Sequence, residues 1–228
     1  MLGTIVNACA IVAGSLTGLV FKGGLADRYK ETVMHAVALC VILVGIKAAL
    51  ASDALLVVIL SLVIGATLGE VLRIEDRLES LGRWLESKVP SGEGSVAKGF
   101  VTASLVFCVG SMAIVGSLES GLTGNHQTLF AKAILDGIIS VIFTTTLGIG
   151  VIFSAVAVFV YQGGITLTAT LIKPFLTPDV VAQMTSAGGL IIMTLGLNML
   201  EVTKIRAGNL LPGIFLPLFW FGLQAAVG

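Results

Sequence analysis

The residues most able to bind a solute or an ion lie in the second half of the sequence, inside apolar segments. Residues 99–200 contain only five charged side chains, which are Glu119, Lys132, Asp136, Lys173 and Asp179. Asp136 lies within an apolar run, where a charge is costly in a membrane unless it has a partner. Asp136 is therefore a candidate site for a coupling ion or a proton. The structural alternative is an ion pair with Lys132, one helical turn earlier.

Glycine, serine and threonine are concentrated around these charges. Residues 107–125 are rich in glycine and hydroxyl side chains, and the run Thr144, Thr145, Thr146 follows Asp136. Glycine allows helices to approach closely or to unwind, and unwound backbone at membrane depth must be buried in protein or line a water-filled cavity. Exposed helix ends then offer N–H groups to an anion or carbonyl groups to a cation. The alternative is tight helix packing through small residues, with the hydroxyls bonded to their own helix.

We therefore predict a binding site for a small solute or ion, lined by hydroxyl groups and backbone, in which Asp136 neutralises or couples a cation. The predicted site residues are Gly110, Ser111, Gly116, Ser117, Glu119, Asn125, Asp136, Ser140, Thr144, Thr145, Thr146, Lys47 and Asn198. Lys47 is close to the end of its apolar segment, so the alternative is that its side chain extends to the membrane surface. For Glu119 the alternative is a helix cap at the membrane edge, and His126 is interpreted as a loop residue.

Motifs of enzymes, cofactor sites and metal sites are missing from the sequence. HExxH, GxSxG, P-loop and Rossmann patterns do not occur, and no His/Cys cluster has metal-ligand spacing. Cys9, Cys40 and Cys108 each lie in an apolar run without CxxC spacing, and we expect small buried apolar side chains there. The chain is therefore predicted not to be an enzyme and to need neither a cofactor nor a metal.

Composition identifies the environment of these residues. Of the 228 residues, 56% are hydrophobic and 11% are charged, with a mean hydropathy of +1.06. A soluble domain carries roughly 25% charged residues, and a disordered chain is poorer in apolar residues than this one. The 13 basic and 13 acidic residues leave no positive excess for nucleic acid. The fold class predicted is an all-α polytopic membrane protein, with lipid as a partner and nucleic acid excluded.

The apolar segments predict about seven transmembrane helices, or six to eight if the central ones are broken or re-entrant. A span needs about 20 mostly apolar residues. Clear spans are 2–21, 33–51, 54–72, 180–200 and 208–227, and 100–118 is a further candidate. The run 130–162 is long for one helix and short for two, and Gly148-Ile149-Gly150 is the expected break.

Charges in the loops predict an orientation. Residues 22–31 and 73–98 are rich in Lys and Arg, which places both on the cytoplasmic side and the N-terminus outside. With seven plain spans the loop with Lys204 and Arg206 would be outside. It lies on the cytoplasmic side if 100–162 crosses the membrane an even number of extra times or contains re-entrant segments. Within 73–89, Ile74, Leu78, Leu81 and Leu85 have helical spacing, so we expect an amphipathic helix at the membrane surface or on a partner, followed by a linker at 91–95.

A weak internal repeat divides this single membrane domain, residues 1–228. Residues 35–50 match 186–201, with Gly45 on Gly196 and Lys47 on Asn198. This predicts a first repeat at 1–72, a helix and linker at 73–98, a Gly/Ser/Thr-rich centre at 99–147 and a second repeat at 148–228. The loop charges make the three-helix repeats inverted, which is an architecture typical of secondary transporters.

Three segments carry a resemblance to a known family. They are MLGTIVNACAIVAGSLTG at the start, FCVGSMAIVGSLESGLTGNHQTLFAKAILDGIISVIFTTTLGIGVIFSAV in the centre and GGLIIMTLGLNMLEVTKIRAGNLLPGIFLPL near the end. They resemble the bacterial membrane family called domain of unknown function 554. The resemblance covers nearly the whole chain and implies a small protein of the bacterial inner membrane. It implies no substrate and no mechanism.

The function predicted from these observations is secondary transport of a small solute or ion. Glycine-rich helix faces favour association, and so small a protein has little room to alternate access alone, so we expect a homo-oligomer. One alternative is a channel in which the same groups line a continuous pore. Another is a non-transporting assembly or sensory membrane protein whose helix at 73–89 binds a partner.

Overall fold

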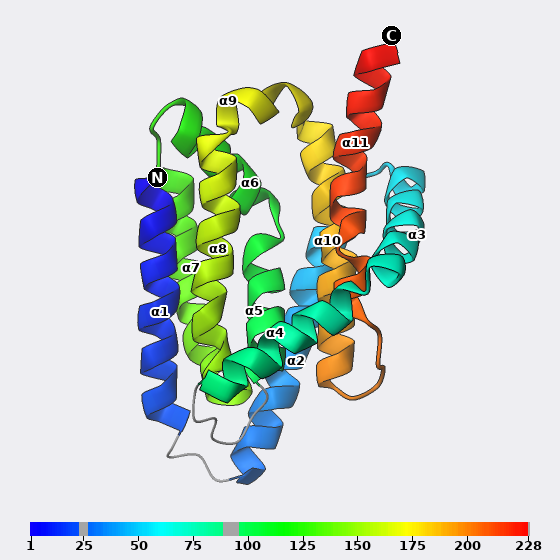
Figure 1. The fold of residues 1–228 in the computed structure, drawn as a ribbon. Helices are drawn as coiled ribbons and strands as arrows, with labels where there is room; N and C mark the ends of the chain where they lie inside the picture. The colour runs from blue at the N-terminus through cyan, green and yellow to red at the C-terminus, as the bar shows by residue number, and fades with distance from the viewer. Residues whose placement is uncertain (23–26, 89–95, 228) are drawn as a thin grey trace. The chain divides into compact units, whose positions relative to one another are not determined.

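The structure is a computed structural model that describes residues 1–22, 27–88 and 96–227 (Figure 1). All regular elements in this described part are helical, which confirms the predicted all-α class. The α-helices are α1 (Leu2–Lys22), α2 (Asp27–Ala49), α3 (Leu55–Leu72), α4 (Ile74–Lys88), α5 (Val96–Cys108), α6 (Ser111–Leu122), α7 (Gln127–Leu147), α8 (Gly150–Leu167), α9 (Ala169–Ile172), α10 (Pro178–Met199) and α11 (Pro212–Val227). Two 3-10 helices are η1 (Lys173–Phe175) and η2 (Ala207–Leu210). The linker expected at 91–95 lies outside the described residues.

Six of the described helices are long and apolar enough to cross a membrane, namely α1, α2, α3, α7, α8 and α10. Helices α5 and α6 pass the same test as a pair and are bent by 61° at the residues between them, so the count is seven if this pair is one broken span. This agrees with the prediction of about seven spans. The last predicted span, 208–227, is divided between η2 and α11 and is too short to count as a spanning helix by the same test.

Glycines mark both breaks in the central region. Gly148 follows α7 with φ 80° and ψ −166°, a backbone conformation that is nearly confined to glycine. The run 130–162 holds two helices because α7 begins at Gln127 and α8 continues to Leu167, beyond both ends of the run. Gly110, with φ 135°, lies between α5 and α6.

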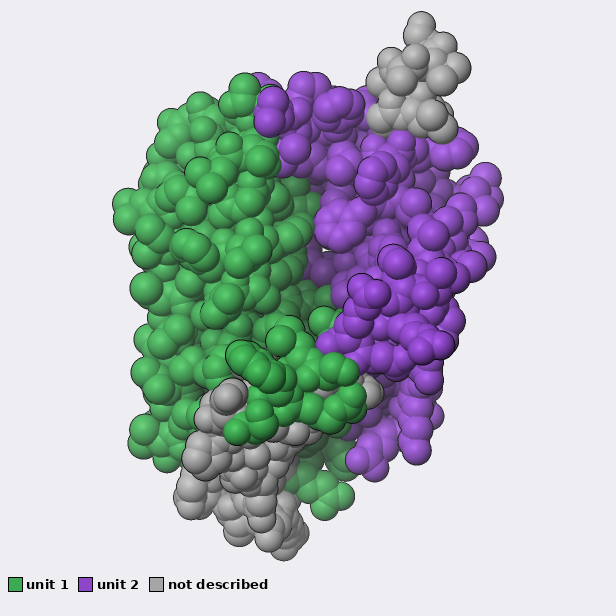
Figure 2. Space-filling view, in the orientation of Figure 1, with its two compact units in different colours: residues 1–37, 78–108, 112–170 green, residues 38–77, 109–111, 171–228 purple. Residues whose placement is uncertain are grey.

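Two compact units make up the chain, and Figure 2 colours them separately. Unit 1 contains residues 1–37, 78–108 and 112–170, and unit 2 contains residues 38–77, 109–111 and 171–228. Unit 1 is built on α1, α5, α7 and α8. Unit 2 is built on the second part of α2 with α3, α10 and α11.

In unit 1, α1 and α7 pack in the same direction through glycine. A Cβ on Gly3 would lie 2.7 Å from Cβ of Leu129, and a Cβ on Gly18 would lie 2.5 Å from the carbonyl oxygen of Val141. Between them, a Cβ on Gly14 would collide with the carbonyl oxygen of Gly137. The contacts rise together along both helices, so the helices are parallel. Glycine is required here because the two backbones touch.

Unit 2 is held by similar contacts and by a polar network at one end of α3. Gly45 packs on the backbone of α10, and Gly69 packs on the backbone of Asn209 in η2. Asn209 donates to a carboxylate oxygen of Glu70 at 2.6 Å and accepts from the backbone N–H of Glu75 at 2.8 Å. That N–H belongs to the first turn of α4 and has no partner within the helix. The side chain of Asn209 therefore caps α4 from a distant part of the chain.

Candidate functional site

Four polar side chains from three helices meet in the interior of unit 1. They are Asn7 of α1, Lys132 and Asp136 of α7, and Gln162 of α8, with exposed fractions of 0%, 7%, 3% and 0%. Asn7 and Lys132 are each the sixth residue of their helix, and Gln162 is the sixth from the end of α8. Because α8 runs back along α1, these three residues lie about 8 Å from the same end of the helices. The cluster is thus inside the membrane-spanning part of unit 1.

Lys132 and Asp136 form a buried ion pair within α7. The ammonium of Lys132 donates to both carboxylate oxygens of Asp136, at 2.8 and 2.7 Å. Their side chains are only 8% and 5% exposed. The pair that the sequence offered as a structural alternative is therefore present. It gives the cluster one positive and one negative charge, so its net charge is zero.

An amide chain extends from Asp136 across three helices. The side-chain N–H2 of Asn7 donates to Oδ2 of Asp136 at 3.0 Å and to Oε1 of Gln162 at 3.3 Å. An ionised carboxylate only accepts hydrogen bonds, so Asn7 must turn its N–H2 group toward Asp136. This orientation leaves Oδ1 of Asn7 and Nε2 of Gln162 without a hydrogen-bond partner. One buried acceptor and one buried donor thus remain free beside the ion pair.

Unit 1 contains further buried hydroxyls without a partner. Within the described part of the chain, the buried side-chain atoms that lack a hydrogen bond belong to Thr4, Asn7, Ser15, Ser104, Ser117, Ser140, Thr144, Gln162 and Thr166. All nine residues belong to unit 1. Buried polar groups in proteins are bonded in about 90% of cases or more, so such a concentration needs an explanation. A ligand or water that enters unit 1 would supply the missing partners.

A polar stripe runs along the buried face of α7. Lys132, Asp136, Ser140 and Thr144 are four residues apart, and all are buried. Side chains at this spacing lie on one face of a helix, and the stripe is about 18 Å long at 1.5 Å per residue. Gly14 and Gly18 of α1 pack against this face: a Cβ on each would lie 3.0 Å from Cβ of Ser140 and 2.8 Å from Cβ of Thr144.

The three consecutive threonines have different environments. Thr144 is fully buried and its hydroxyl has no partner. The hydroxyls of Thr145 and Thr146 donate to the carbonyl oxygen of Ile142 at 2.7 and 3.3 Å. Only Thr144 belongs to the stripe, because successive helical residues point about 100° apart. The structure therefore separates Thr144 from its two neighbours.

Other predicted site residues lie at the hairpin between α6 and α7. Ser117 is fully buried, and a Cβ on Gly116 would lie 3.0 Å from Thr128. The carboxylate of Glu119 accepts from the hydroxyl of Thr128 at 2.7 Å, and Asn125 is exposed and accepts from the backbone N–H of Gln127 at 3.1 Å. Thr128 is eight residues before Asp136 on α7, or about 12 Å along the helix. Glu119 therefore links α6 to α7 near one end of unit 1, and Asn125 bonds the first residue of α7.

The remaining four predicted residues belong to unit 2. A Cβ on Gly110 would meet nothing within 4 Å, so glycine is needed here for its positive φ and not for close packing. The side chain of Ser111 lies outside the described residues. Lys47 is exposed in the last turn of α2. Asn198 donates to the carbonyl oxygen of Ile205 at 2.7 Å, which fixes the loop after α10.

The predicted site did not include Asn7 and Gln162. Both are amides inside apolar segments, and this is the signal that would have found them, because an amide in a span needs a partner on another helix. Their partner is Asp136, which is more than a hundred residues from Asn7. The spacing of four residues between Lys132, Asp136, Ser140 and Thr144 is a second signal in the sequence, because it places these polar side chains on one face of α7.

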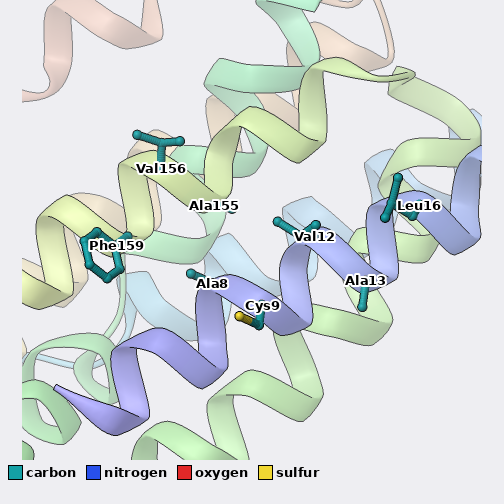
Figure 3. A pocket seen from close by; sticks show the side chains of 8 residues that line it. All are labelled: Ala8, Cys9, Val12, Ala13, Leu16, Ala155, Val156 and Phe159. Carbon is teal, nitrogen blue, oxygen red and sulfur yellow. The ribbon is translucent and has the colours of Figure 1, made fainter.

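An apolar groove lies on the outside of unit 1, between α1 and α8 (Figure 3). It has a volume of about 440 Å³ and is lined by Ala8, Cys9, Val12, Ala13, Leu16, Ala155, Val156 and Phe159. Cys9 is exposed here and Cys40 is exposed on α2, so the expectation of buried cysteines was wrong for both. In a membrane span an apolar side chain can face lipid as well as the protein interior. Apart from the thiol of Cys9, the side chains that line the groove are hydrocarbon, and none of them belongs to the polar cluster. Among the described residues there is no group of three His, Cys, Asp or Glu side chains that could hold a metal ion.

Comparison with known proteins identifies relatives along nearly the whole chain. The family described as Protein of unknown function (DUF554) matches residues 2–221. The protein named uncharacterized membrane protein YdfK, from Bacillus subtilis (strain 168), is 34% identical over 221 residues, which is 95% of this chain and 94% of the relative. The protein named uncharacterized protein YqgA, from Escherichia coli (strain K12), is 27% identical over 225 residues, covering 96% and 95%. No solved structure matches significantly. The chain belongs to the DUF554 family of proteins and is a membrane protein.

Proposed function

We propose that this member of the DUF554 family is a secondary transporter that binds a small solute or ion inside unit 1. The observation that carries the proposal is the group of nine buried polar atoms without partners, all of them in unit 1, which also contains the Lys132–Asp136 pair. A purely structural core would leave few such atoms, because each one costs about 1–3 kcal/mol. Polar groups at membrane depth that are not needed for packing mark substrate and ion pathways in membrane proteins.

The contacts between α2 and α10 support the inverted repeats that such transporters use. Gly45 packs on the backbone of Gly189 and Met193, while Gly196 packs on the backbone of Ala38 and Ile42. The register that matches Gly45 with Gly196 also matches Ala38 with Gly189 and Ile42 with Met193. The two contacts are therefore equivalent under exchange of the repeats. An antiparallel pair with a two-fold axis between its helices has this reciprocal pattern.

The loop charges and the helix surfaces support an orientation in the membrane, a location and an oligomeric state. We place the protein in the bacterial inner membrane with its N-terminus outside, because the predicted basic loops then lie in the cytoplasm. We also propose a homo-oligomer, because small residues on helix surfaces favour association in lipid. The partner-binding alternative is supported by α4, where Leu81 and Trp84 are exposed apolar side chains on an amphipathic helix.

Flux through liposomes that contain the full chain tests the proposal. The probes are chloride, nitrate, sodium, rubidium and glycine, each added outside. We expect saturable uptake of at least one probe in the wild type. Thr144→Val should lower it about tenfold, the equivalent of one hydrogen bond of about 1.4 kcal/mol. Thr145→Val is the matched control, because its hydroxyl bonds its own helix, and should leave uptake unchanged.

The form of the flux separates the candidate functions. A carrier saturates with probe concentration and carries little current, whereas a channel gives a current that rises with the driving force. Flux that is equal in the wild type, Thr144→Val and empty liposomes for every probe would contradict both. In that case the partner-binding role of α4 becomes the better account.

A further inference from the structure

We propose that Asp136 takes up a transported proton and that Lys132, released from its ion pair, then binds a small monoanion. The inference rests on the proposed transport function and names its substrate class and its coupling ion. In the step, a proton from solution forms an O–H bond on the Asp136 carboxylate, and no other covalent bond changes. The ammonium of Lys132 keeps its protons and becomes available to the anion.

Charge balance inside the membrane leads to this conclusion. The cluster is neutral while Asp136 is ionised and paired with Lys132 at 2.7 Å. Protonation of Asp136 alone would leave the buried ammonium uncompensated, which is strongly unfavourable at membrane depth. A bound monoanion restores neutrality. Both the empty and the loaded states then carry zero net charge, so both can change conformation without moving charge through the low-dielectric interior.

The groups around the pair fit one proton and one anion. Asn7 of α1 bonds Asp136, Gln162 of α8 bonds Asn7, and both side chains are uncharged. Cys108 at the end of α5 is within electrostatic range of both Lys132 and Asp136, and Tyr161 of α8 is within range of Cys108. The thiol and the phenol are neutral in their protonated forms. Lys132 is thus the positive charge of the cluster, and a single lysine matches a single negative charge.

Asn7 is able to serve both states of Asp136. Its N–H2 group faces the carboxylate now, while its Oδ1 is free. When Asp136 is protonated, its O–H needs an acceptor, and a turn of the Asn7 amide supplies Oδ1. The same turn moves the N–H2 group to the free side, where it becomes a donor for the anion. Gln162 is bonded to Asn7 at 3.3 Å and, having a donor and an acceptor, can follow the change.

Donors for an anion continue along the α7 stripe. Ser140 lies one turn beyond Asp136, and Thr144 lies one turn further. Both hydroxyls are buried and have no partner, so each can donate to a bound anion without breaking another bond. Together with the ammonium of Lys132, they make a chain of donors and no further negative charge. A cation would meet the ammonium instead and is disfavoured.

Anion binding to the purified full-length protein in nanodiscs tests the inference. The readout is the rise in unfolding temperature with sodium chloride or sodium nitrate, compared with the bulky anion gluconate at equal ionic strength. If one proton is taken up per anion, linkage predicts that the apparent affinity of the wild type rises about tenfold per unit fall in pH over the range where Asp136 is ionised in the empty protein and protonated in the loaded protein. Equal affinity at all pH values in that range would overturn the proposal.

Three variants sharpen the test. Asp136→Asn mimics the protonated carboxyl, so we expect chloride or nitrate to bind at every pH. Lys132→Gln should not bind either anion at any pH. Lys47→Gln is the matched control, because Lys47 is exposed in unit 2, and it should behave as the wild type. Binding retained in Lys132→Gln, or absent in a folded Asp136→Asn, would refute the assignment.

A measurement on the wild type alone covers the case in which a variant does not fold. Chloride is added to nanodiscs in weak buffer, and the proton uptake is recorded. We expect one proton per bound anion, and binding without proton uptake would overturn the coupling. Liposome flux separates a failure of the proposed transport function from a failure of this inference. Proton-linked anion binding without flux would refute transport and leave the coupled binding of proton and anion in place. Saturable flux that does not change with pH would refute the coupling to protons and leave the transport function in place.

Discussion

The buried ion pair makes a prediction about stability that does not depend on transport. Lys132 donates to both oxygens of Asp136 at 2.8 and 2.7 Å, and both side chains are almost completely buried. Removing one partner from such a pair leaves an isolated buried charge and destabilises proteins by about 3–5 kcal/mol. Replacing both partners with apolar groups of similar volume is often neutral or stabilising, because two desolvated charges are removed together.

We therefore expect Lys132→Met to lower the free energy of unfolding by about 3 kcal/mol, the lower end of this range, since Asp136 can relieve part of the loss by taking up a proton. Asp136→Leu should cost a similar amount. The double variant should lie within about 1 kcal/mol of the wild type, which gives a coupling energy of about 5 kcal/mol between the two sites.

Reversible unfolding in mixed micelles, with helical circular dichroism as the readout, provides the four free energies of this cycle. Leu135→Met and Ile138→Met are suitable controls, because both side chains are exposed on α7 and should change stability by less than about 0.5 kcal/mol. Additive single variants, with a double variant about 6 kcal/mol less stable than the wild type, would refute a direct buried pair. If the double variant is folded, it is also a protein without the proposed proton and anion sites.

Two further predictions concern the glycine contacts and the cap of α4. Gly14→Ala should destabilise the protein by about 1–3 kcal/mol, because its Cβ would collide with the carbonyl oxygen of Gly137. Gly164→Ala has open space around its Cβ and should be neutral or stabilising by up to about 1 kcal/mol. Unfolding in mixed micelles measures both variants, and equal effects on stability would contradict the backbone contact at Gly14. Asn209→Ala should weaken the first turn of α4 by about 1 kcal/mol, because the N–H of Glu75 loses its acceptor. Hydrogen exchange should then be faster in that turn, and unchanged protection there would contradict the capping role.

The spans and the break at Gly148 were predictable because they depend on local properties of the chain, whereas the break at Gly110 divides a segment, 100–118, that was expected to be one span. Hydropathy over about 20 residues identifies a span, and Gly148 between two apolar runs identifies a turn. The site was less predictable because its members come from three helices. Asn7 reaches Asp136 only because α1 packs against α7 through Gly14, and this contact joins residues far apart in sequence. No local pattern specifies which helices become neighbours.

The residues predicted from composition alone were separated by helical geometry. Thr144, Thr145 and Thr146 look alike in the sequence, but only Thr144 faces the polar interior. Lys47 and Asn198 were chosen for their matching repeat positions, and the structure places one on the surface and the other in a loop contact. Direction on a helix and contacts between helices, which composition does not record, decide these outcomes.

The same structure contains a control for the alternative that the hydroxyls of α7 serve packing alone. A hydroxyl buried only for packing bonds a carbonyl oxygen in the preceding turn of its own helix. Ser154 does so with Val151 at 2.6 Å, and Thr185 does so with Val181 at 2.7 Å, although both are buried. Ser140 and Thr144 are as deeply buried and make no such bond.

Glycines face both hydroxyls across the contact between α1 and α7. Gly14 and Gly18 of α1 lie against Ser140 and Thr144, and a glycine offers no side chain that could accept or donate. The contact brings two helices together and at the same time leaves the hydroxyls between them unpaired. Packing alone would be better served by alanine and valine at these positions, because neither would bury an unsatisfied polar atom. The two unpaired hydroxyls in line with Asp136 therefore support the proposal that a polar ligand enters unit 1.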